Sequence, residues 1–134
     1  MGKAPTRRLG QLGEEVAARF LEGRGFEILE RNLRSRLGEI DLIARDGPTL
    51  VFVEVKARRG QPCEPPQVAV DARKRSRLAR LALDYLAREW LRELSCRFDV
   101  VAVTFGSGDA GDATGGAPRV EHFPGAFAAD GWTG

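Results

Sequence analysis

The sequence predicts an α/β domain in which a mixed β-sheet is flanked by helices. Two segments, 9–23 and 71–91, carry apolar residues at helical spacing. Five shorter apolar runs are typical of strands, and they lie at 26–32, 38–45, 50–57, 97–105 and 119–123. Because helical and strand segments alternate along a chain of 134 residues, we expect one core and one domain.

The first helix is expected over residues 9–23. The apolar residues that predict its buried stripe are Leu9, Leu12, Val16 and Phe20. Glu14 lies off the centre of that stripe, so the pattern alone allows it an exposed position. The helix is expected to stop at the Gly23-Arg24-Gly25 stretch.

The second helix is expected over residues 71–91, with Asp71 as its N-cap. Its inward face is predicted to consist of Leu78, Leu81, Ala82 and Tyr85. Residues 106–118, GSGDAGDATGGAP, have the composition of a flexible loop, and 128–134 are expected to form a loose tail. The core of the single domain, 1–134, therefore covers about 9–127.

The two central strands predict a β-hairpin whose register follows from its turn. In Gly47-Pro48, glycine supplies the positive φ that opens a type II′ turn, so Asp46 faces Thr49. Counting inward on both strands places Asp41 opposite Glu54, with both side chains on one face. A loop of odd length would instead send the two carboxylates to opposite faces.

Two facing carboxylates repel each other unless a cation lies between them. Asp41 and Glu54 offer hard oxygen ligands, which suit Mg²⁺ or Mn²⁺ and the phosphate chemistry that these ions support. Lys56 shares the face by the period-two rule and could stabilise charge on a phosphate. The alternative is a surface hairpin whose polar face meets solvent, with Lys56 simply pairing with Glu54.

Basic residues flank this hairpin in clusters, although the net charge is only +2. We expect them to contact nucleic-acid phosphates, and the alternative for any one cluster is a solvated face. The residues assigned to nucleic-acid binding are Arg34, Arg36, Arg58, Arg73, Lys74, Arg77 and Arg80.

The cysteines, the histidine and the hydropathy restrict the class of protein. Cys63 and Cys96 lie far apart without metal-ligand spacing, which favours a reducing compartment, and we expect the cytoplasm. His122 is the only histidine, so a multi-histidine metal site is excluded and a structural role is expected. No apolar stretch approaches the roughly 20 residues of a membrane span.

The stretches GEIDLIARDG and LVFVEVKAR together resemble the core of the PD-(D/E)xK nucleases, in which an acid on one strand precedes E-V-K on the next. Ile40 stands where the proline of that motif would be, and this removes no reacting group. When the first helix and the segments RFDVVAV and VEHFPGAF are considered together with this hairpin, the chain resembles the YraN family. Members of that family are regarded as endonuclease-like.

The resemblance implies a restriction-endonuclease-like fold and a site made of several polar side chains. It implies Glu14, Asp41 and Glu54 as metal ligands, Lys56 as the catalytic lysine and Glu39 as an accessory acid. We expect a nuclease that cuts nucleic acid, taken to be DNA, with Mg²⁺ or Mn²⁺. Relatives that cut branched DNA often act as dimers, which makes a homodimer one option. The alternative function is a nucleic-acid-binding or accessory protein that keeps the fold without turnover.

Overall fold

The computed structural model describes residues 4–60, 72–89, 94–106 and 117–127. Its elements are α1 (Ala4–Gly23), β1 (Glu27–Ser35), β2 (Gly38–Asp46), β3 (Thr49–Arg59), α2 (Ala72–Arg88), β4 (Ser95–Phe105) and β5 (Arg119–Phe127). The order of helices and strands is the one expected from the sequence, and α1 begins earlier than predicted. The expected N-cap at Asp71, most of the loop 106–118 and the tail 128–134 lie outside the described residues, and α2 ends at Arg88, before the predicted end at Leu91.

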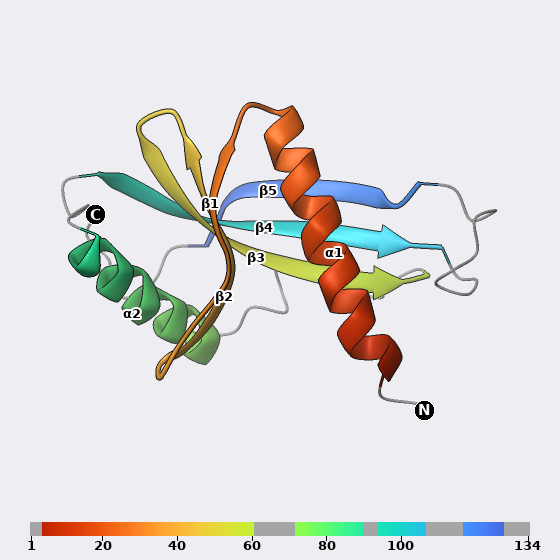
Figure 1. The fold of residues 1–134 in the computed structure, drawn as a ribbon, viewed down its shortest axis with the longest axis horizontal. Coiled ribbons are helices and arrows are strands. Elements are labelled where there is room, and N and C mark those ends of the chain that lie inside the picture. The colour runs from red at the N-terminus through yellow and green to blue at the C-terminus, as the bar shows by residue number, and fades with distance from the viewer. Residues whose placement is uncertain (1–3, 61–71, 90–93, 107–116, 128–134) are drawn as a thin grey trace.

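The five strands form one mixed sheet in the order β1-β2-β3-β4-β5 (Figure 1). β3 and β4 are parallel, whereas the other neighbouring strands are antiparallel. A parallel pair needs a crossover connection, and α2 lies between β3 and β4 in the chain. The expected α/β class is confirmed, and the architecture is compatible with a restriction-endonuclease-like fold.

The β2–β3 hairpin has the register predicted from its turn. Asp46 faces Thr49, and the pairing continues inward to Leu42 and Val53. Gly47 has a φ of 59°, which is the left-handed region that glycine enters without a steric penalty. The ladder ends at the Leu42–Val53 pair, one residue short of the predicted pairing of Asp41 with Glu54.

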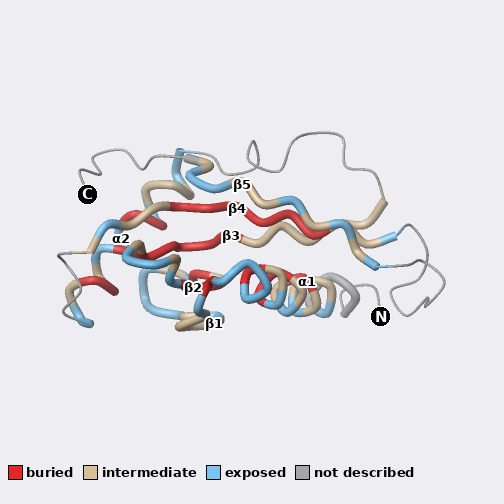
Figure 2. Tube along the Cα trace, turned by 90° about the horizontal axis from the view of Figure 1, so that it is seen from above, coloured by how far each residue is buried: buried red, intermediate tan, exposed pale blue. Residues whose placement is uncertain are grey.

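The sheet is buried on both faces, and each helix covers one of them. α2 packs against the face that carries Ile43 and Phe52, and α1 packs against the face that carries Leu42 and Val53. Along each strand these neighbours alternate, as the period of two requires. Figure 2 shows that burial is greatest along β3 and β4, the two inner parallel strands.

The buried face of α1 differs from the predicted stripe. Its fully buried residues are Ala17, Ala18 and Leu21, whereas the predicted Leu9, Leu12, Val16 and Phe20 are only partly buried. The reason is close contact with β3, because a Cβ added at Gly13 would lie 2.6 Å from the Cβ of Ala57. Glu14, next to this contact, is therefore drawn toward the sheet and is partly buried.

β5 is longer than the predicted strand at 119–123. It runs alongside β4 as far as Phe127, and its register shifts between Phe98 and Val100 of β4. Gly125 lies within this extension with a φ of 58°. In the described ranges, neither helix is apolar over the length needed to cross a membrane.

Candidate metal and nucleic-acid site

The candidate site lies where the hairpin ladder gives way to side-chain contacts. Beyond the Leu42–Val53 pair, the backbone N–H of Val55 donates a hydrogen bond of 2.8 Å to Oδ2 of Asp41. The carboxylate thus takes the role that a strand carbonyl would have in the ladder. This contact ties Asp41 to the strand segment that carries Glu54 and Lys56.

The predicted acids are brought together around one cavity of about 630 Å³. Its lining includes residues of α1, β1, β2, β3 and α2. The lining residues are Glu14, Arg34, Ser35, Gly38, Glu39, Asp41, Glu54, Lys74, Arg77 and Leu78. All four acids named from the sequence therefore share a cavity, including Glu39, which also pairs with Arg34 at 3.7 Å.

Glu54 is buried and holds two lysine ammonium groups. Its relative exposure is only 7%, and Nζ of Lys56 lies 3.3 Å from its Oε2. Lys74 of α2 also donates to this Oε2. The position of Lys56 beside Glu54 agrees with the period-two prediction. Lys74, assigned to nucleic-acid binding with the other basic residues, instead lies inside the site as an ion-pair partner.

Burial and neighbouring charge shift the protonation of these groups. Burial and, to a smaller extent, the charge of Glu54 raise the pKa of Asp41 to about 7. The hydrogen bond from Val55 acts in the opposite direction but is weaker than burial. Burial lowers the pKa of Lys56, and the charge of Lys74 adds to this effect, while Glu54 opposes it. For Lys74, burial favours the neutral form, but the hydrogen bond to Glu54, the charge of Glu54 and smaller contributions from Lys56 and Asp41 together outweigh burial and raise the pKa.

Glu14 approaches the same cavity from α1. Burial raises its pKa, while hydrogen bonds with Asn32 and Asp41 lower it in part. Asn32 itself has a φ of 50°, a left-handed conformation that asparagine tolerates better than most residues. Nothing in the pattern LERNLRS distinguished Asn32 as a site residue, although an asparagine within a strand is a weak signal of such a conformation.

The donor set fits a hard divalent cation that keeps several water ligands. Mg²⁺ is usually held by one or two carboxylates, with water and substrate phosphate as further ligands, and Asp41 and Glu54 supply two carboxylates. Among the described residues, no three acidic, histidine or cysteine side chains are grouped tightly enough to hold a metal ion by themselves. Glu14 would therefore contribute through water or after a side-chain movement.

The predicted arginines divide between two neighbouring cavities. Arg34 and Arg77 line the acidic one. A second cavity, of about 420 Å³, is lined by Arg36, Leu37, Arg73, Arg77 and Arg80. Arg77 belongs to both, so acidic and basic cavities adjoin. Arg58, near the end of β3, lines neither of these two cavities.

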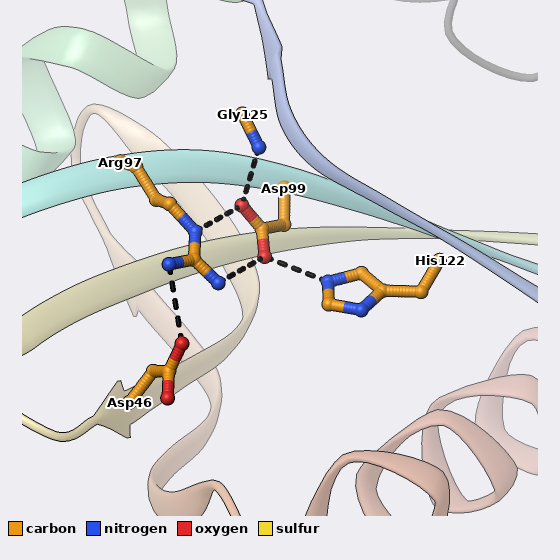
Figure 3. Close-up of polar contacts among 5 residues, drawn as sticks. All are labelled: Asp46, Arg97, Asp99, His122 and Gly125. Carbon is orange, nitrogen blue, oxygen red and sulfur yellow. Dashed lines mark hydrogen bonds and ion pairs between the residues drawn. The ribbon is translucent and has the colours of Figure 1, made fainter. Parts of the chain in front are cut away.

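A separate polar cluster contains His122, the only histidine of the sequence. Asp99 is fully buried and accepts two hydrogen bonds from Arg97, at 2.9 and 3.2 Å (Figure 3). Its carboxylate also lies 2.7 Å from Nε2 of His122 and accepts a bond of 2.9 Å from the backbone N–H of Gly125. The cluster joins β4 to β5, which supports the structural role expected for His122.

Comparison with known proteins gives one consistent result. The family model described as uncharacterised protein family UPF0102 matches residues 13–103. The chain is 49% identical to a UPF0102 protein of Pelotomaculum thermopropionicum over 119 residues, which cover 89% of this chain and 94% of the relative. It is 42% identical to a UPF0102 protein of Geotalea uraniireducens over 125 residues, which cover 93% of each. The matched range includes the four acids of the acidic cavity and the two lysines that contact Glu54.

Proposed function

The chain belongs to the uncharacterised protein family UPF0102, and we propose that it is a metal-dependent nuclease that hydrolyses phosphodiester bonds in nucleic acid. The observation that carries the proposal is the convergence of Asp41, Glu54 and Lys56 at the end of the β2–β3 ladder. Two neighbouring acids that can hold a cation, with a lysine and arginines around them, suit the hydrolysis of a phosphodiester.

Each side chain of the site has a distinct part in the proposed reaction. Asp41 and Glu54 would hold Mg²⁺ or Mn²⁺, and Glu14 would hold a water ligand from α1. When bound, the ion would supply activation of the attacking water and neutralisation of phosphate charge. Lys56, partly buried beside Glu54, would donate to a phosphate oxygen as negative charge develops there. Arg34 and Arg77 would position the strand by contacts to its backbone.

One observation favours the alternative function, a nucleic-acid-binding protein without turnover. Lys74 and Lys56 both contact Glu54, so the charge of the buried carboxylate is already offset by side chains. A site whose buried carboxylate is paired with two lysines in this way could keep the fold, and the arginines around the two cavities, without binding a cation. The two functions differ in whether Glu54 exchanges a lysine for a metal ion.

The test is cleavage by purified protein of branched, single-stranded and duplex DNA and of single-stranded RNA, with Mn²⁺ or with EDTA. A nuclease of this kind cuts at least one substrate only when the metal is present. Glu54→Gln, which keeps the size of the side chain but not its charge, should abolish the cut. The exposed acid Glu15 supplies a matched control as Glu15→Gln. Absence of cutting across the panel would favour the alternative, and equal cutting by Glu54→Gln would contradict the assigned site.

We place this activity on DNA in the cytoplasm. DNA is the substrate of the nucleases that the hairpin resembles, and a free thiol at Cys96 is compatible with a reducing compartment. The RNA arm of the same assay tests the choice of substrate, because preferential cutting of RNA would overturn it.

A further inference from the structure

The basic cavity beside the acidic site has a composition that the nuclease chemistry leaves unexplained. Its lining consists of four arginines and one leucine: Arg36, Leu37, Arg73, Arg77 and Arg80. Arg36 and Leu37 come from the turn between β1 and β2, and the other three come from α2. The cavity thus lies between a turn at the edge of the sheet and the helix that covers this end of the sheet.

Within the described part of the chain, no carboxylate neutralises these arginines. Among the residues that the structure describes, none of the four makes an ion pair, whereas Arg34, Arg88 and Arg97 each pair with a carboxylate. Gathering like charges around one cavity is unfavourable unless an anion enters it. Guanidinium groups match the geometry of a phosphate and can donate to it in pairs. The cavity therefore points to a phosphate.

Arg77 connects this cavity to the acidic one. Its stem lies against the backbone of β2, because a Cβ added at Gly38 would meet Cδ of Arg77 at 3.0 Å. Glycine at position 38, where φ is 135°, leaves the room in which the arginine stem lies. A nucleic-acid strand that has one phosphate in the acidic cavity could thus place a neighbouring phosphate in the basic cavity, on the far side of Arg77.

Leu37 adds an apolar contact to this phosphate position. It is 41% exposed, one of two large hydrophobic side chains this exposed in the described structure, and the other is Leu83. In a perfect duplex the bases are stacked and paired, so a leucine at the backbone meets no base face. An apolar side chain gains a contact when a base is unstacked, as in the wedges that proteins insert at distorted steps.

We propose that the basic cavity is a subsite for one unpaired nucleotide, with its phosphate among the arginines and its base against Leu37. The proposal rests on the proposed nuclease function only in taking the ligand to be nucleic acid. It places the substrate among single-stranded, gapped or branched nucleic acids rather than fully paired duplex. Arg36, Arg73 and Arg80 bind the phosphate, and Arg77 spans the two positions.

The test is binding in EDTA, where no cleavage can occur. A dye-labelled single-stranded oligonucleotide and a fully paired duplex of the same sequence are titrated by fluorescence anisotropy over a range of salt concentrations. The double variant Arg36→Gln/Arg80→Gln should lower the log-log salt slope for the single strand by about 1.4, because each lost contact removes about 0.7. Arg8→Gln/Arg119→Gln, which removes two exposed arginines outside the cavity, should leave the slope nearly unchanged.

Leu37→Ala tests the apolar contact separately. It should weaken binding of the single strand about fivefold without a change in salt slope, since an apolar contact releases no counterions. It should spare the duplex, and Leu83→Ala, which removes the other exposed leucine, should affect neither ligand. If the two arginine double variants had equal salt slopes for single-strand binding, the placement of a phosphate in the basic cavity would be overturned. Equal loss of single-strand and duplex binding by Leu37→Ala would overturn the unpaired nucleotide.

The two proposals can fail independently. If the arginine and leucine variants behave as expected but the wild type cuts nothing with Mn²⁺, the subsite stands and the nuclease function fails. If the wild type cuts with Mn²⁺ while both double variants bind alike, the nuclease function stands and the subsite fails. Absence of nucleic-acid binding by the wild type in EDTA would overturn the subsite, whatever the cleavage assay shows.

Discussion

The backbone N–H of Val55 donates to the Asp41 carboxylate at 2.8 Å, and this bond holds an acid in a position where its charge is disfavoured. Burial and the charge of Glu54 raise the pKa of Asp41 to about 7, so the bond from Val55 only partly offsets their effect. A buried acid of this kind, kept beside a second acid, lowers stability in the metal-free state. A bound cation would relieve the unfavourable burial and mutual repulsion of the two carboxylates.

The first prediction concerns pH. The folded protein keeps a proton on Asp41 up to about pH 7, whereas the unfolded chain releases it near the ordinary value of 3.8. The folded state therefore binds more protons in this window, and the free energy of unfolding should fall as the pH rises through it, by at most about 4 kcal/mol from Asp41. Asp41→Asn should flatten this fall, as measured by urea denaturation in EDTA at pH 5 and pH 8.

Asp84→Asn is the control for this measurement. Asp84 forms an exposed ion pair with Arg88 on α2, and surface pairs contribute little to stability. Its pH dependence should follow that of the wild type. If the free energy of unfolding changes equally in Asp41→Asn and Asp84→Asn between pH 5 and pH 8, the titration of Asp41 is not the cause of the pH dependence.

The second prediction concerns metal binding. Mn²⁺ should raise the melting temperature of the wild type, because a ligand that binds only the folded state stabilises it by about 2.7 kcal/mol at 100 times its Kd. Asp41→Asn should show a smaller shift, since it lacks one charged ligand. Thermal scans with increasing Mn²⁺ measure both shifts, with Asp84→Asn again as control. Equal shifts for wild type and Asp41→Asn would remove the metal site from the proposal.

The third prediction concerns Lys74, which contacts the Glu54 oxygen that the ion is proposed to take. Lys74→Met removes a competing positive charge, so Mn²⁺ should bind several-fold tighter in the absence of nucleic acid. The same change should lower stability in EDTA, because buried Glu54 loses an ion-pair partner. Calorimetric titration and urea denaturation measure the two effects. Arg88→Met, on the same helix but exposed, should change neither. Weaker Mn²⁺ binding in Lys74→Met would mean that Lys74 supports the ion instead.

The fourth prediction compares two glycines of α1. A Cβ at Gly13 would meet Ala57 at 2.6 Å, so Gly13→Ala should push α1 away from β3 and cost about 1–3 kcal/mol of stability. A Cβ at Gly10 would meet nothing within 4 Å, so Gly10→Ala should stabilise the helix by up to about 1 kcal/mol. Urea denaturation measures both. If both substitutions changed the free energy of unfolding in the same direction, the close packing of α1 on β3 would be contradicted.

Local patterns were enough to predict the hairpin that carries the candidate site. The register of β2 with β3, from Asp46–Thr49 to Leu42–Val53, depends on the two-residue turn at Gly47-Pro48, and the placement of Lys56 beside Glu54 depends on strand alternation. Both are properties of a contiguous stretch, so they can be counted along the chain. The five-strand mixed sheet was likewise indicated by the alternation of helical and strand segments.

Non-local packing determined what the patterns missed. The buried face of α1 follows small residues at Gly13, Ala17 and Ala18, because the helix approaches β3 closely. The stripe of large apolar residues is therefore only partly buried, although Val16 and Phe20 of that stripe pack against the core. The placement of Glu14 near Asp41 was implied only by the family resemblance. The pairing of Lys74 with Glu54 spans 20 residues and depends on how the crossover brings α2 over the sheet.

The last prediction separates a catalyst from a binding protein through Lys56. Its ammonium lies 3.3 Å from the Glu54 carboxylate and its side chain is only 19% exposed, although Lys56 is not among the residues that line the acidic cavity. A cation that acts chiefly in the transition state can be removed without loss of ground-state binding. Lys56→Ala should therefore reduce single-turnover cleavage about 100-fold or more, in the range found when one stabilising donor is lost.

The other properties of Lys56→Ala should remain close to those of the wild type. Its Mn²⁺-induced rise in melting temperature should persist, because Asp41 and Glu54 are intact, and its nucleic-acid affinity should fall only modestly, since arginines supply most of it. Lys56→Arg, which keeps a positive charge, should recover part of the rate. If Lys56→Ala cuts as fast as the wild type at saturating protein concentration, Lys56 only offsets the charge of Glu54. If Lys56→Ala instead loses its response to Mn²⁺, the lysine supports the acids and not the reacting phosphate.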